Sequence, residues 1–586
     1  MPGIIGDTGD SNLMKMIKAM DHRSDLKVKL FDKRVPALGV VYREKFKPLI
    51  WEDNSKVGVV YGCAYIQGAS SASVEKVIKM VLQNPERALL HLDGSFLIAC
   101  IDFKENKLVL ATDKLATQPC FYSCLNDRVI FSSKIKSILP QLDTGTIDLK
   151  AIGDLIAFEF MLGKRTLVKE VKSLPSASFL EWGCGKVRIK RYWDFNYSFK
   201  RRDRGYPVRL LSYYKKSVDI TLRNLDQYRI GIFLSGGLDS RLLAGVIEKQ
   251  SANKVKTITF DGNPFGEINL RLGREVAECL GLENFQLQFD PAALKPEKIE
   301  KAVIMTEGMI PWTHAAWFLP VMDNLWILED IDVIIGNWGQ GEFFGEDLGA
   351  EELTSQRDPV DVLANNVVFR DSAPEKIIEA ILKGRYSVRG EIRKLVLKSN
   401  RKTNYEKVLD VMYQNFYPNF HYKGNVLPNF VDVVSILPNT ELLNMISCLP
   451  LNLRWRRILN KVYLYPVSPL KLELIRLIDT NLARIPYERT GAMPKSNIFM
   501  HFIRYYLKVI LGRGNAINFG SLMRRDELQE YIYNLILDFG NRDFASMDLL
   551  SDLFDKHMSG KADYTIPLSA ITTAEIFIER AGLECV

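Results

Sequence analysis

The sequence predicts a multidomain α/β protein, in which an α+β sandwich domain precedes an α/β domain with a mainly helical carboxyl-terminal region. Length is the first observation, because 586 residues exceed the roughly 250–300 that one hydrophobic core accommodates. Short apolar runs separated by turn residues fill residues 1–195, which is the pattern of antiparallel sheet. From about residue 208 strand and helix patterns alternate, as they do in parallel sheets with crossover helices.

The first domain, assigned to residues 1–200, is expected to combine antiparallel strands with a few helices. The expected strands are 38–42, 57–61, 95–101, 107–111 and 128–132. Residues 73–83 and 148–162 have helical spacing and enough length for helices. A densely charged stretch in which Gly205 and Pro207 lie close together marks the boundary, so the second domain is assigned to residues 205–586.

The second domain is expected to open with alternating helices and strands. The expected helices are 208–225, 240–249 and 268–280, the last followed by Gly281 as a carboxyl-terminal cap. The expected strands are 229–234, 254–260, 285–289 and 332–335. Beyond about residue 350 the spacing is helical, without a clear series of strands.

Composition excludes several classes of protein. Hydrophobic residues make up 47% and charged residues 25%, which is ordinary for a globular protein. No apolar run reaches the roughly 20 residues that span a bilayer. The most apolar late segment, 499–511, is interrupted by His501, Arg504 and Lys508, and it is interpreted as an amphipathic helix that faces the core rather than a membrane. No membrane partner is therefore expected.

Charge and cysteine spacing argue against nucleic-acid binding, a zinc site and a disulfide framework. The net charge of +8 is spread along the chain, and clusters such as residues 200–202 are too short for a nucleic-acid-binding arm. The eight cysteines include no Cys-x-x-Cys pair, so neither a zinc site nor a disulfide framework is expected. The start of the chain has no signal-peptide pattern, and a reducing cytoplasm is the expected location.

One loop carries a specific chemical signal. The segment Ser235-Gly236-Gly237-Leu238-Asp239-Ser240 lies between a predicted strand and a predicted helix, where open α/β sheets bind ligands. Two glycines allow backbone N–H groups to approach a phosphate, and the following helix directs its positive end at the same anion. Asp239 would repel phosphate unless a cation lay between them, and magnesium favours this combination of ligands.

A purely structural alternative for this loop is a Gly-Gly turn capped by Asp and Ser. The strand–loop–helix context favours phosphate binding over that alternative. The loop lacks the Gly-x-x-x-x-Gly-Lys-Ser/Thr pattern, which excludes a Walker-type nucleotide site.

The loop resembles the Ser-Gly-Gly-x-Asp-Ser loop of the ATP-pyrophosphatase superfamily, and the chain resembles asparagine synthetase over about residues 1–350. Segments 91–96, 112–122, 163–166 and 191–194 are similar to the glutaminase domain of that family. The resemblance implies an Ntn-hydrolase-like sandwich followed by an adenine-nucleotide-α-hydrolase-like ATP-pyrophosphatase domain. It also implies a ligase that uses ATP and magnesium, and it allows a homodimer.

The glutaminase half departs from the family pattern at two places. The family's nucleophile is the cysteine exposed by removal of the initiator methionine, whereas this chain has Pro2, which offers neither thiol nor hydroxyl. The family's glutamine-holding Asn-Gly-Glu segment falls on residues 61–66, where the Asn and Glu are missing. Cys63 is interpreted as a small buried hydrophobe rather than a replacement nucleophile. Glutaminase activity is therefore not expected.

The synthetase half also departs from the pattern. Residues 333–345 are similar to the family's Gly-x-Gly-Ser-Asp-Glu-x-Phe-Gly-Gly loop, which makes Gly336 a nucleotide-binding candidate. The family's metal-binding Asp falls on Gly341, and the following Glu342 is the candidate catalytic and metal-binding carboxylate beside Asp239. The alternative is a glycine-rich turn with a surface glutamate.

Further site residues follow from the resemblance. Glu307 matches the family's substrate-site glutamate and is the candidate general base, the alternative being an ordinary helix-end Glu. Arg456, with Lys461 close by, matches the lysine that neutralises pyrophosphate, the alternative being a solvated basic face. Adenine is expected against Thr259 and Phe260, in a strand that could equally belong to the core. The remaining nucleotide-binding candidates are Leu234, Ser235, Gly236, Gly237, Leu238, Asp239 and Ser240.

Three functions remain open. The first is ATP-dependent adenylation of a carboxylate, by default aspartate, followed by amide formation with ammonia. The second is a ligase or cyclase for another carboxylate and amine, similar to β-lactam synthetase or lasso-peptide cyclase. The third is a nucleotide-binding pseudoenzyme, which Gly341 favours and Asp239 disfavours.

Overall fold

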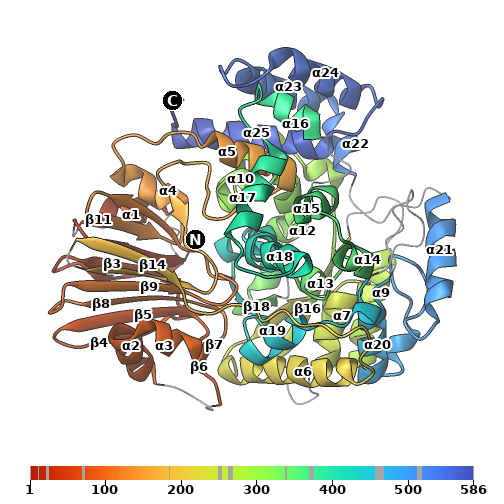
Figure 1. Ribbon diagram of the computed structural model, residues 1–586, viewed down its shortest axis with the longest axis horizontal. Helices are drawn as coiled ribbons and strands as arrows, with labels where there is room; N and C mark the ends of the chain where they lie inside the picture. Colours follow the sequence, from red (N-terminus) through yellow and green to blue (C-terminus); the bar gives the residue numbers. More distant parts are fainter. Residues whose placement is uncertain are drawn as a thin grey trace.

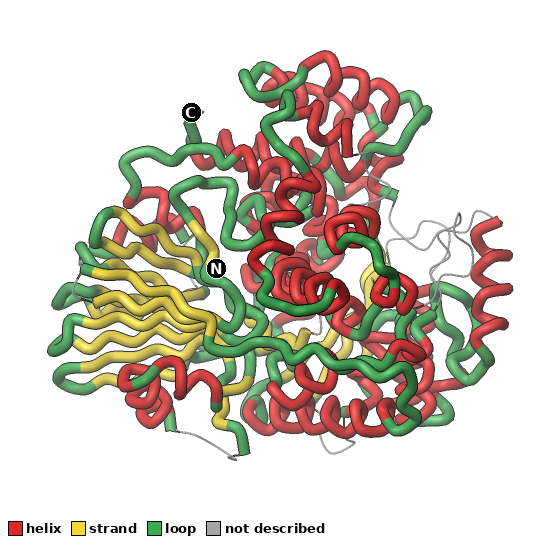
Figure 2. The backbone as a smooth tube through the Cα atoms, viewed as in Figure 1, coloured by secondary structure: helices red, strands yellow, loops and turns green. Residues whose placement is uncertain are grey.

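The computed structural model of the protein contains two parts side by side (Figure 1). It describes residues 2–10, 12–20, 25–68, 73–183, 185–247, 254–261, 268–336, 339–346, 348–367, 375–455, 467–510 and 518–584. Strands dominate the amino-terminal part and helices the remainder (Figure 2). The expected multidomain α/β class is therefore confirmed.

The first domain is built from two six-stranded antiparallel sheets. In the first sheet the strand order is β12 (Lys172–Ser173), β10 (Phe121–Leu125), β11 (Arg128–Ser132), β1 (Gly3–Asp7), β3 (Ala37–Arg43) and β2 (Leu26–Phe31). In the second it is β14 (Lys186–Arg191), β13 (Ser178–Gly183), β9 (Lys107–Thr112), β8 (Phe96–Asp102), β5 (Lys56–Gly62) and β4 (Leu49–Glu52). All five strands expected from the sequence are present.

The two sheets pack face to face with helices on their outer sides. Alternating residues such as Ile4, Val59 and Leu110 fill the space between the sheets. Helix α4 (Ile135–Ile138) packs on the first sheet and α1 (Met14–Ala19) packs on α4, while α2 (Val74–Gln83) packs on the second sheet and α3 (Pro85–Leu90) packs on α2. This gives four layers, helix–sheet–sheet–helix, as an Ntn-type sandwich requires.

The second domain contains a parallel five-stranded sheet. Its order is β17 (Glu283–Gln288), β16 (Val255–Asp261), β15 (Ile230–Phe233), β18 (Val333–Gly336) and β19 (Asp432–Ser435). The chain builds outward from β15 to β16 and β17, then crosses to β18 on the other side of β15. The crevice between β15 and β18 is thus a topological switch point, where such sheets bind ligands.

One strand of this sheet escaped the sequence analysis. We expected no strands beyond about residue 350, yet β19 pairs in parallel with β18 at residues 432–435. Four residues beginning with Asp432 and ending with Ser435 give too short an apolar run to be distinguished from a loop.

Helices surround the sheet and form the rest of the chain. They are α6 (Tyr206–Asn224), α7 (Leu238–Val246), α9 (Ile268–Leu280), α10 (Pro296–Thr306), α11 (Trp312–Ala316), α12 (Leu319–Asp323), α13 (Gln340–Phe343), α14 (Ala350–Thr354), α15 (Pro359–Val367), α16 (Glu375–Ile381), α17 (Val388–Lys398), α18 (Asn404–Val411), α19 (Thr440–Ser447), α20 (Pro469–Ile478), α21 (Ile498–Ile510), α22 (Phe519–Met523), α23 (Asp526–Gly540), α24 (Met547–Met558) and α25 (Thr565–Ala581). None of these described helices is both long and apolar enough to cross a bilayer.

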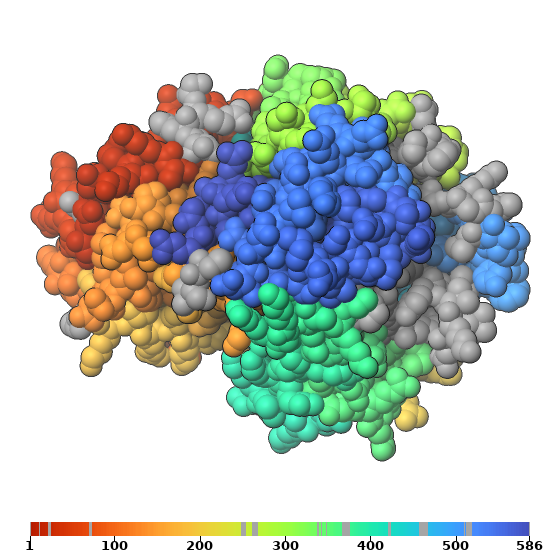
Figure 3. All heavy atoms as spheres, turned by 90° about the horizontal axis from the view of Figure 1, so that it is seen from above, coloured from red at the N-terminus to blue at the C-terminus, as the bar shows by residue number. Residues whose placement is uncertain are grey.

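The carboxyl-terminal helix returns to the first domain. Helix α25 packs on α5 (Leu149–Phe158), and the backbone N–H of Ile147 donates to the carbonyl of Glu584 at 3.1 Å. Figure 3 shows these last residues, in blue, against the orange part of the first domain. Helix α5 ends four residues before the expected Leu162, because Glu159 adopts a left-handed φ of 64°.

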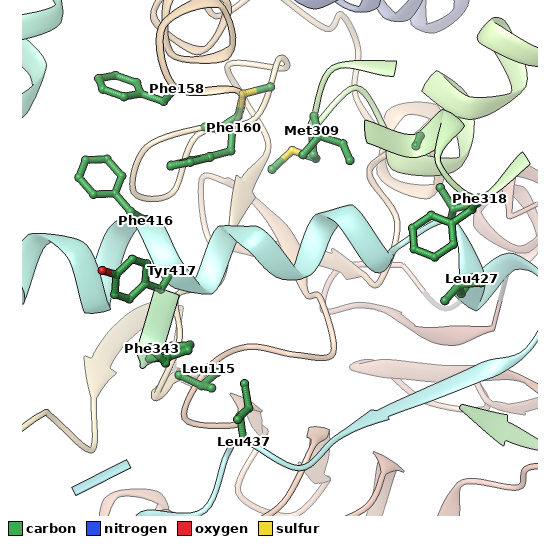
Figure 4. Close-up of a cluster of buried hydrophobic side chains, with 14 of the residues drawn as sticks. Leu115, Phe158, Phe160, Met309, Phe318, Phe343, Phe416, Tyr417, Leu427 and Leu437 are labelled. Atoms are coloured by element: carbon green, nitrogen blue, oxygen red, sulfur yellow. The ribbon is translucent and has the colours of Figure 1, made fainter. Parts of the chain in front are cut away.

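A shared apolar core joins the two domains (Figure 4). Phe158 and Phe160 of the first domain face Phe416 of the second, with ring centroids 5.7 and 5.6 Å apart. Because these rings belong to one continuous buried cluster, the domains are fixed to each other by packing as well as by polar contacts.

The segment expected to face the core does form a helix, but with the opposite orientation. In α21 the large apolar residues Phe499, Leu507 and Ile510 are exposed, by 68%, 54% and 66%. His501, which appeared to interrupt the apolar segment, is instead buried. The prediction of an amphipathic helix is confirmed and the prediction of a core-facing apolar side is wrong.

Candidate functional site at the carboxyl edge of the parallel sheet

The glycine-rich loop occupies the switch point of the parallel sheet. It follows β15 directly and leads into α7, whose first residue is Leu238. Gly237 is the N-cap residue of α7, and no side chain caps this helix. The N–H groups in the first turn of α7 are therefore not used by a capping side chain. An anion placed before α7 would meet these donors and the positive end of the helix dipole.

Hydroxyl and amide groups hold the loop in shape. The N–H of Ser235 donates to Oγ of Ser240 at 3.0 Å, and the N–H of Gly237 donates to Oγ of Ser235 at 3.1 Å. The N–H of Gly236 donates to Oδ1 of Asn269 at 2.7 Å, while Nδ2 of Asn269 donates to the carbonyl of Phe260 at 2.8 Å. Asn269, at the start of α9, therefore ties the loop to the end of β16.

The buried Arg241 holds the loop through hydrogen bonds to backbone carbonyls. Arg241 is fully buried and donates to the carbonyls of Gly236 at 3.1 Å, Ile485 at 2.7 Å and Pro486 at 2.8 Å. Burial lowers the pKa of Arg241 to about 10, with nearby Glu488 opposing the shift. A Cβ at Gly236 would lie 2.8 Å from Cβ of Glu488, so the close approach of the 485–488 segment requires glycine there.

Asp239 belongs to a charged cluster drawn from three segments of the chain. Its Oδ1 accepts a hydrogen bond from Nε2 of Gln340 at 3.0 Å, and its Oδ2 accepts from Nζ of Lys471 at 2.6 Å. Lys471 also lies 2.7 Å from Oε1 of Glu346. The ammonium group of Lys471 thus bridges two carboxylates beside the loop.

Burial of this cluster is uneven. The side chain of Lys471 is 2% exposed, whereas those of Asp239 and Glu346 are 38% and 30% exposed. Burial alone would lower the pKa of Lys471, but the two carboxylates outweigh it and raise that pKa above its ordinary value. Lys471 is therefore charged at neutral pH, while the carboxylates of Asp239 and Glu346 are partly exposed to solvent.

Glu346 occupies the place from which a side chain is missing at position 341. A Cβ on Gly341 would lie 2.9 Å from Oε2 of Glu346, 3.2 Å from Nζ of Lys471 and 3.6 Å from Oδ2 of Asp239. A carboxylate at position 341 would enter this same space. Glu346 therefore supplies negative charge where the family pattern has an aspartate at position 341.

The predicted adenine-side residues gather at the ends of β15 and β16. Leu234 is buried and its N–H donates to the carbonyl of Ile258 at 2.8 Å. Thr259 is also buried, and its Oγ1 accepts from Nδ2 of Asn284 at 2.9 Å. The half-buried ring of Phe260 packs edge-on to that of Phe233, at 5.7 Å. These contacts are compatible with a core strand and with an aromatic wall beside a nucleotide.

Two predicted residues fall near the site, and two lie outside the described part. Gly336 ends β18 and pairs with Ser435, next to the switch point. Glu342 belongs to α13, one residue from Gly341, and its side chain lies outside the described residues. Arg456 and Lys461 also lie outside the described residues. Roles for Glu342 and Arg456 stay predictions.

Glu307 is placed at the domain interface. It follows α10 with a left-handed φ of 59°, is 3% exposed, and its Oε2 accepts hydrogen bonds from the N–H groups of Ile135 and Lys136 at the start of α4. Nζ of Lys134 lies 4.0 Å from its Oε1. Burial raises the pKa of Glu307, opposed by Lys134 and Lys136.

These interface contacts favour the helix-end interpretation of Glu307. Among the described residues its hydrogen bonds and ion pair all lead to the first domain, and none leads to the Asp239 cluster. Its role as a general base stays a prediction. His314 is likewise paired across the interface, with Glu159.

The segment 61–66, on which the family's glutamine-holding motif falls, lies at the domain interface. Cys63 is 7% exposed, and burial raises the pKa of its thiol to about 12. The neighbouring Tyr61 donates a hydrogen bond to the buried carboxylate of Asp432, which also pairs with Arg43 at 3.0 Å. Asp432 belongs to β19 of the second domain, so these residues dock one domain onto the other.

Four residues of the site were not predicted from the sequence. Lys471, Asn269 and Arg241 contact the loop or Asp239, and Glu346 contacts Lys471. Glu346 carried a usable signal, because it stands where the family loop continues with glycine, five residues after the missing aspartate. Lys471 carried none, since a lone lysine in an apolar helix resembles any amphipathic position.

Comparisons with known proteins match two separate parts of the chain. The glutamine amidotransferase domain family matches residues 65–193, and the asparagine synthase family matches residues 215–322. Glutamine-hydrolyzing asparagine synthetase 1 of Bacillus subtilis (strain 168) is 27% identical over 209 residues, 35% of this chain and 32% of that protein. Amidase chyE of Penicillium rubens is 24% identical over 344 residues, 53% of this chain and 50% of that protein.

These matches are partial. The chain spans about a third of the length of the first of these relatives and half of the second. Among solved structures, the glutamine phosphoribosylpyrophosphate amidotransferase of B. subtilis complexed with ADP and GMP has a TM-score of 0.23 at 11% identity, covering 48% of this chain and 65% of that chain. So weak a likeness does not bear on the fold.

Proposed function

Because the chain belongs to the asparagine synthetase family, we propose that it is an ATP-dependent carbon–nitrogen ligase that adenylates a carboxylate and passes the acyl group to an amine. The observation that carries the proposal is the Asp239–Lys471–Glu346 cluster at the mouth of the glycine-rich loop. Two open carboxylates around a buried ammonium beside a helix amino terminus suit the phosphates of ATP together with a divalent cation.

The loop and α7 would bind the pyrophosphate portion of ATP. The uncapped first turn of α7 supplies N–H donors, and Ser235 and Ser240 supply hydroxyl groups. The N–H groups of Ser235, Gly236 and Gly237 donate to Ser240, Asn269 and Ser235 in this conformation, so ATP would exchange some of these bonds for bonds to phosphate oxygens. Adenine would lie toward Leu234, Thr259 and Phe260.

Magnesium fits this donor set. Among the described residues no three His, Cys, Asp or Glu side chains gather into a metal site, so the protein alone does not enclose a cation. Magnesium is commonly held by one or two carboxylates together with substrate phosphates. Asp239 and Glu346 would provide those carboxylates, and the absent side chain of Gly341 leaves room for Glu346. A bound magnesium ion would neutralise phosphate charge.

Lys471 would stabilise the charge that develops during adenylation. A carboxylate oxygen attacks the α-phosphorus of ATP, the bond to the bridging oxygen of the β-phosphate breaks, and pyrophosphate leaves with that electron pair. The Lys471 ammonium group, held by Asp239 and Glu346, lies beside the loop that would bind this leaving group. The amine then attacks the acyl carbon, AMP leaves, and the amine gives up a proton to a base, for which Glu307 is the candidate.

The amine would not come from glutamine. Pro2 offers no nucleophile, and the buried Cys63, whose thiol has a pKa of about 12, stays protonated at neutral pH. Free ammonia or a larger amine is therefore the proposed second substrate. Aspartate is the default carboxylate, and a ligase or cyclase for another carboxylate is the main alternative. A pseudoenzyme is disfavoured, because Glu346 restores the carboxylate that Gly341 removes.

Pyrophosphate release by the purified protein with ATP and magnesium tests this proposal. Candidate acids, beginning with aspartate, are combined with either ammonium or glutamine, and Asp239→Ala serves as the inactive control. Release that depends on an acid and on ammonium but not on glutamine supports a ligase without glutaminase activity.

Equal rates with glutamine and ammonium would contradict the loss of glutaminase function. Bound ATP without release for any acid and amine in a wide panel would favour the pseudoenzyme. Release that persists in Asp239→Ala would show that the reaction does not use this loop.

A further inference from the structure

Helix α21 presents an apolar face to solvent. Six side chains between 40% and 68% exposed form this face, namely Phe499, Met500, Ile503, Tyr506, Leu507 and Ile510. At 3.6 residues per turn they fall within one sector of about 120°, and no charged residue lies among them. A helix of a water-facing surface normally has the reverse arrangement.

The polar side of α21 is the side that contacts the protein. His501 is buried and its ring nitrogens lie 2.9 Å from Oγ1 of Thr490 and 3.0 Å from the carbonyl of Met493. Nζ of Lys508 donates to the carbonyl of Glu488 at 2.8 Å, and Arg504 donates to the carbonyl of Gly491. The helix is therefore held in this orientation by its polar residues, and its apolar face points outward.

The surrounding sequence is strongly basic. From Arg489 to Arg513 the chain contains five lysines and arginines and no aspartate or glutamate. Over the whole chain acidic residues number 70 of 586, so a stretch of this length would ordinarily contain several. A face of Phe, Ile, Leu and Tyr flanked by cations matches helices that lie in the interface of an anionic bilayer.

The size of the face argues against a second protein as its partner. A helix of 13 residues is about 20 Å long and about 10 Å wide, so one face offers on the order of 200 Å². A stable protein–protein interface needs about 800 Å² from each partner. A bilayer sets no such minimum, because a single amphipathic helix inserts its apolar face among the acyl chains.

We propose that the exposed apolar face of α21, with its basic surroundings, docks the protein onto the surface of a membrane that carries anionic headgroups. Helix α21 lies at the margin of the molecule, opposite the first domain (Figures 1 and 3), where a flat surface can reach it. The backbone N–H of Glu488 donates to the carbonyl of Gly236 at 3.1 Å, and Lys508 holds the carbonyl of the same Glu488. Docking through α21 would therefore bring the glycine-rich loop close to the membrane.

Vesicle co-sedimentation of the full-length protein tests the proposal. Vesicles of phosphatidylcholine alone are compared with vesicles containing about a third phosphatidylserine, at low and high salt. The variant Phe499→Glu/Ile510→Glu places two charges in the apolar face. Leu397→Glu, at a 76% exposed position of α17, is the matched control for adding charge to an exposed apolar residue.

The parent protein and Leu397→Glu should bind anionic vesicles equally, and the double variant should bind at least about tenfold more weakly. High salt and neutral vesicles should each weaken binding of the parent. Unchanged circular dichroism and thermal midpoint would show that the double variant is folded, as expected for exposed positions.

Three results would overturn the proposal. One is the absence of vesicle binding by the parent, and another is equal binding by the parent and the double variant. The third is a dimer of the parent in sedimentation equilibrium that the double variant converts to monomer without any change in vesicle binding, because the face would then bind a second copy of the chain.

Discussion

The two domains have each lost a residue that the family pattern requires, with opposite consequences. In the first domain the nucleophile position is Pro2, and no thiol or hydroxyl takes its place, because the nearby Cys63 is buried and protonated. In the second domain position 341 is Gly, and the carboxylate of Glu346 fills the space of the missing side chain. The first position therefore offers no thiol or hydroxyl, whereas the second region has a carboxylate that another residue contributes.

Around the buried Tyr61, the first domain makes polar contacts with the second domain. Tyr61 and Arg43 hold the buried carboxylate of Asp432, and Gln118 donates to the carbonyl of Val433 at 2.7 Å. These contacts join strands of the first domain to β19 of the second. We therefore expect substitutions at these interface contacts to affect stability, and substitutions around Asp239 to affect the balance of charge and activity.

Replacing Lys471 by alanine should give the largest loss of activity. The change removes the only cation contacted by both Asp239 and Glu346 among the described residues, and it leaves two carboxylates to repel each other and the phosphates. We expect the kcat for pyrophosphate release to fall about 10³-fold, the upper range for removing one group that stabilises developing charge. Steady-state kinetics with saturating ATP measures it.

The control for Lys471 is an exposed lysine in an ion pair of no proposed function. Lys79, paired with Glu75 on α2 and 47% exposed, serves this purpose. Lys79→Ala should retain parental activity. A loss of less than about tenfold for Lys471→Ala would indicate that this ammonium group lies away from the reacting phosphates.

Moving the carboxylate from position 346 to position 341 should show whether Glu346 compensates for the glycine at position 341. Glu346→Gln should lower activity about 10²-fold, because one cation-binding carboxylate becomes a neutral amide. Gly341→Asp alone should also lower activity, since its Cβ would lie 2.9 Å from Oε2 of Glu346 and would crowd two negative charges. The double variant Gly341→Asp/Glu346→Gly, which restores the family pattern, should recover to within about tenfold of the parent.

Manganese binding in the presence of ATP, followed by electron paramagnetic resonance, gives an independent measurement of the same exchange. Affinity should fall in Glu346→Gln and return in the double variant. Recovery of activity without recovery of metal binding would assign Glu346 a role in holding Lys471 rather than the cation.

The sequence could predict most of the fold and the loop of the site, but not the side chains that surround Asp239. Strands such as β5 and β9 and the loop at 235–240 depend on local alternation and on glycine spacing, which the sequence displays directly. The pairing of Lys471 with Asp239 joins residues 232 positions apart, and local patterns contain nothing about such contacts. Helix α21 shows the related limit, because its period is visible in the sequence, but which side of it meets the protein is decided by tertiary contacts of His501 and Lys508.

Asp432→Asn should cost stability rather than catalysis. The amide can still accept a hydrogen bond from Tyr61 or Arg43, but the buried Arg43 loses its counter-charge. We expect the free energy of unfolding to fall by about 2 kcal/mol, with activity per folded molecule unchanged. Denaturant unfolding measures it, and Tyr61→Phe, which removes one hydrogen bond and no charge, should cost less. A large loss of activity at full stability would mean that β19 contributes to the reaction.

Glu307→Gln should have the smallest effect on stability and decides between the two interpretations of this residue. Burial raises the pKa of Glu307, so the folded state binds its proton more tightly than the unfolded state does. This group therefore makes the fold less stable as pH rises from about 4.5 through the folded-state pKa, and the penalty is constant above it.

Glutamine can still accept hydrogen bonds from the N–H groups of Ile135 and Lys136 and has no such penalty. We expect the free energy of unfolding at pH 7 to stay within about 1 kcal/mol of the parent and to lose its slope in the acidic window. If activity persists as well, Glu307 is an interface residue. If activity disappears while stability holds, the carboxylate is the base, and the domain interface then also takes part in the chemistry.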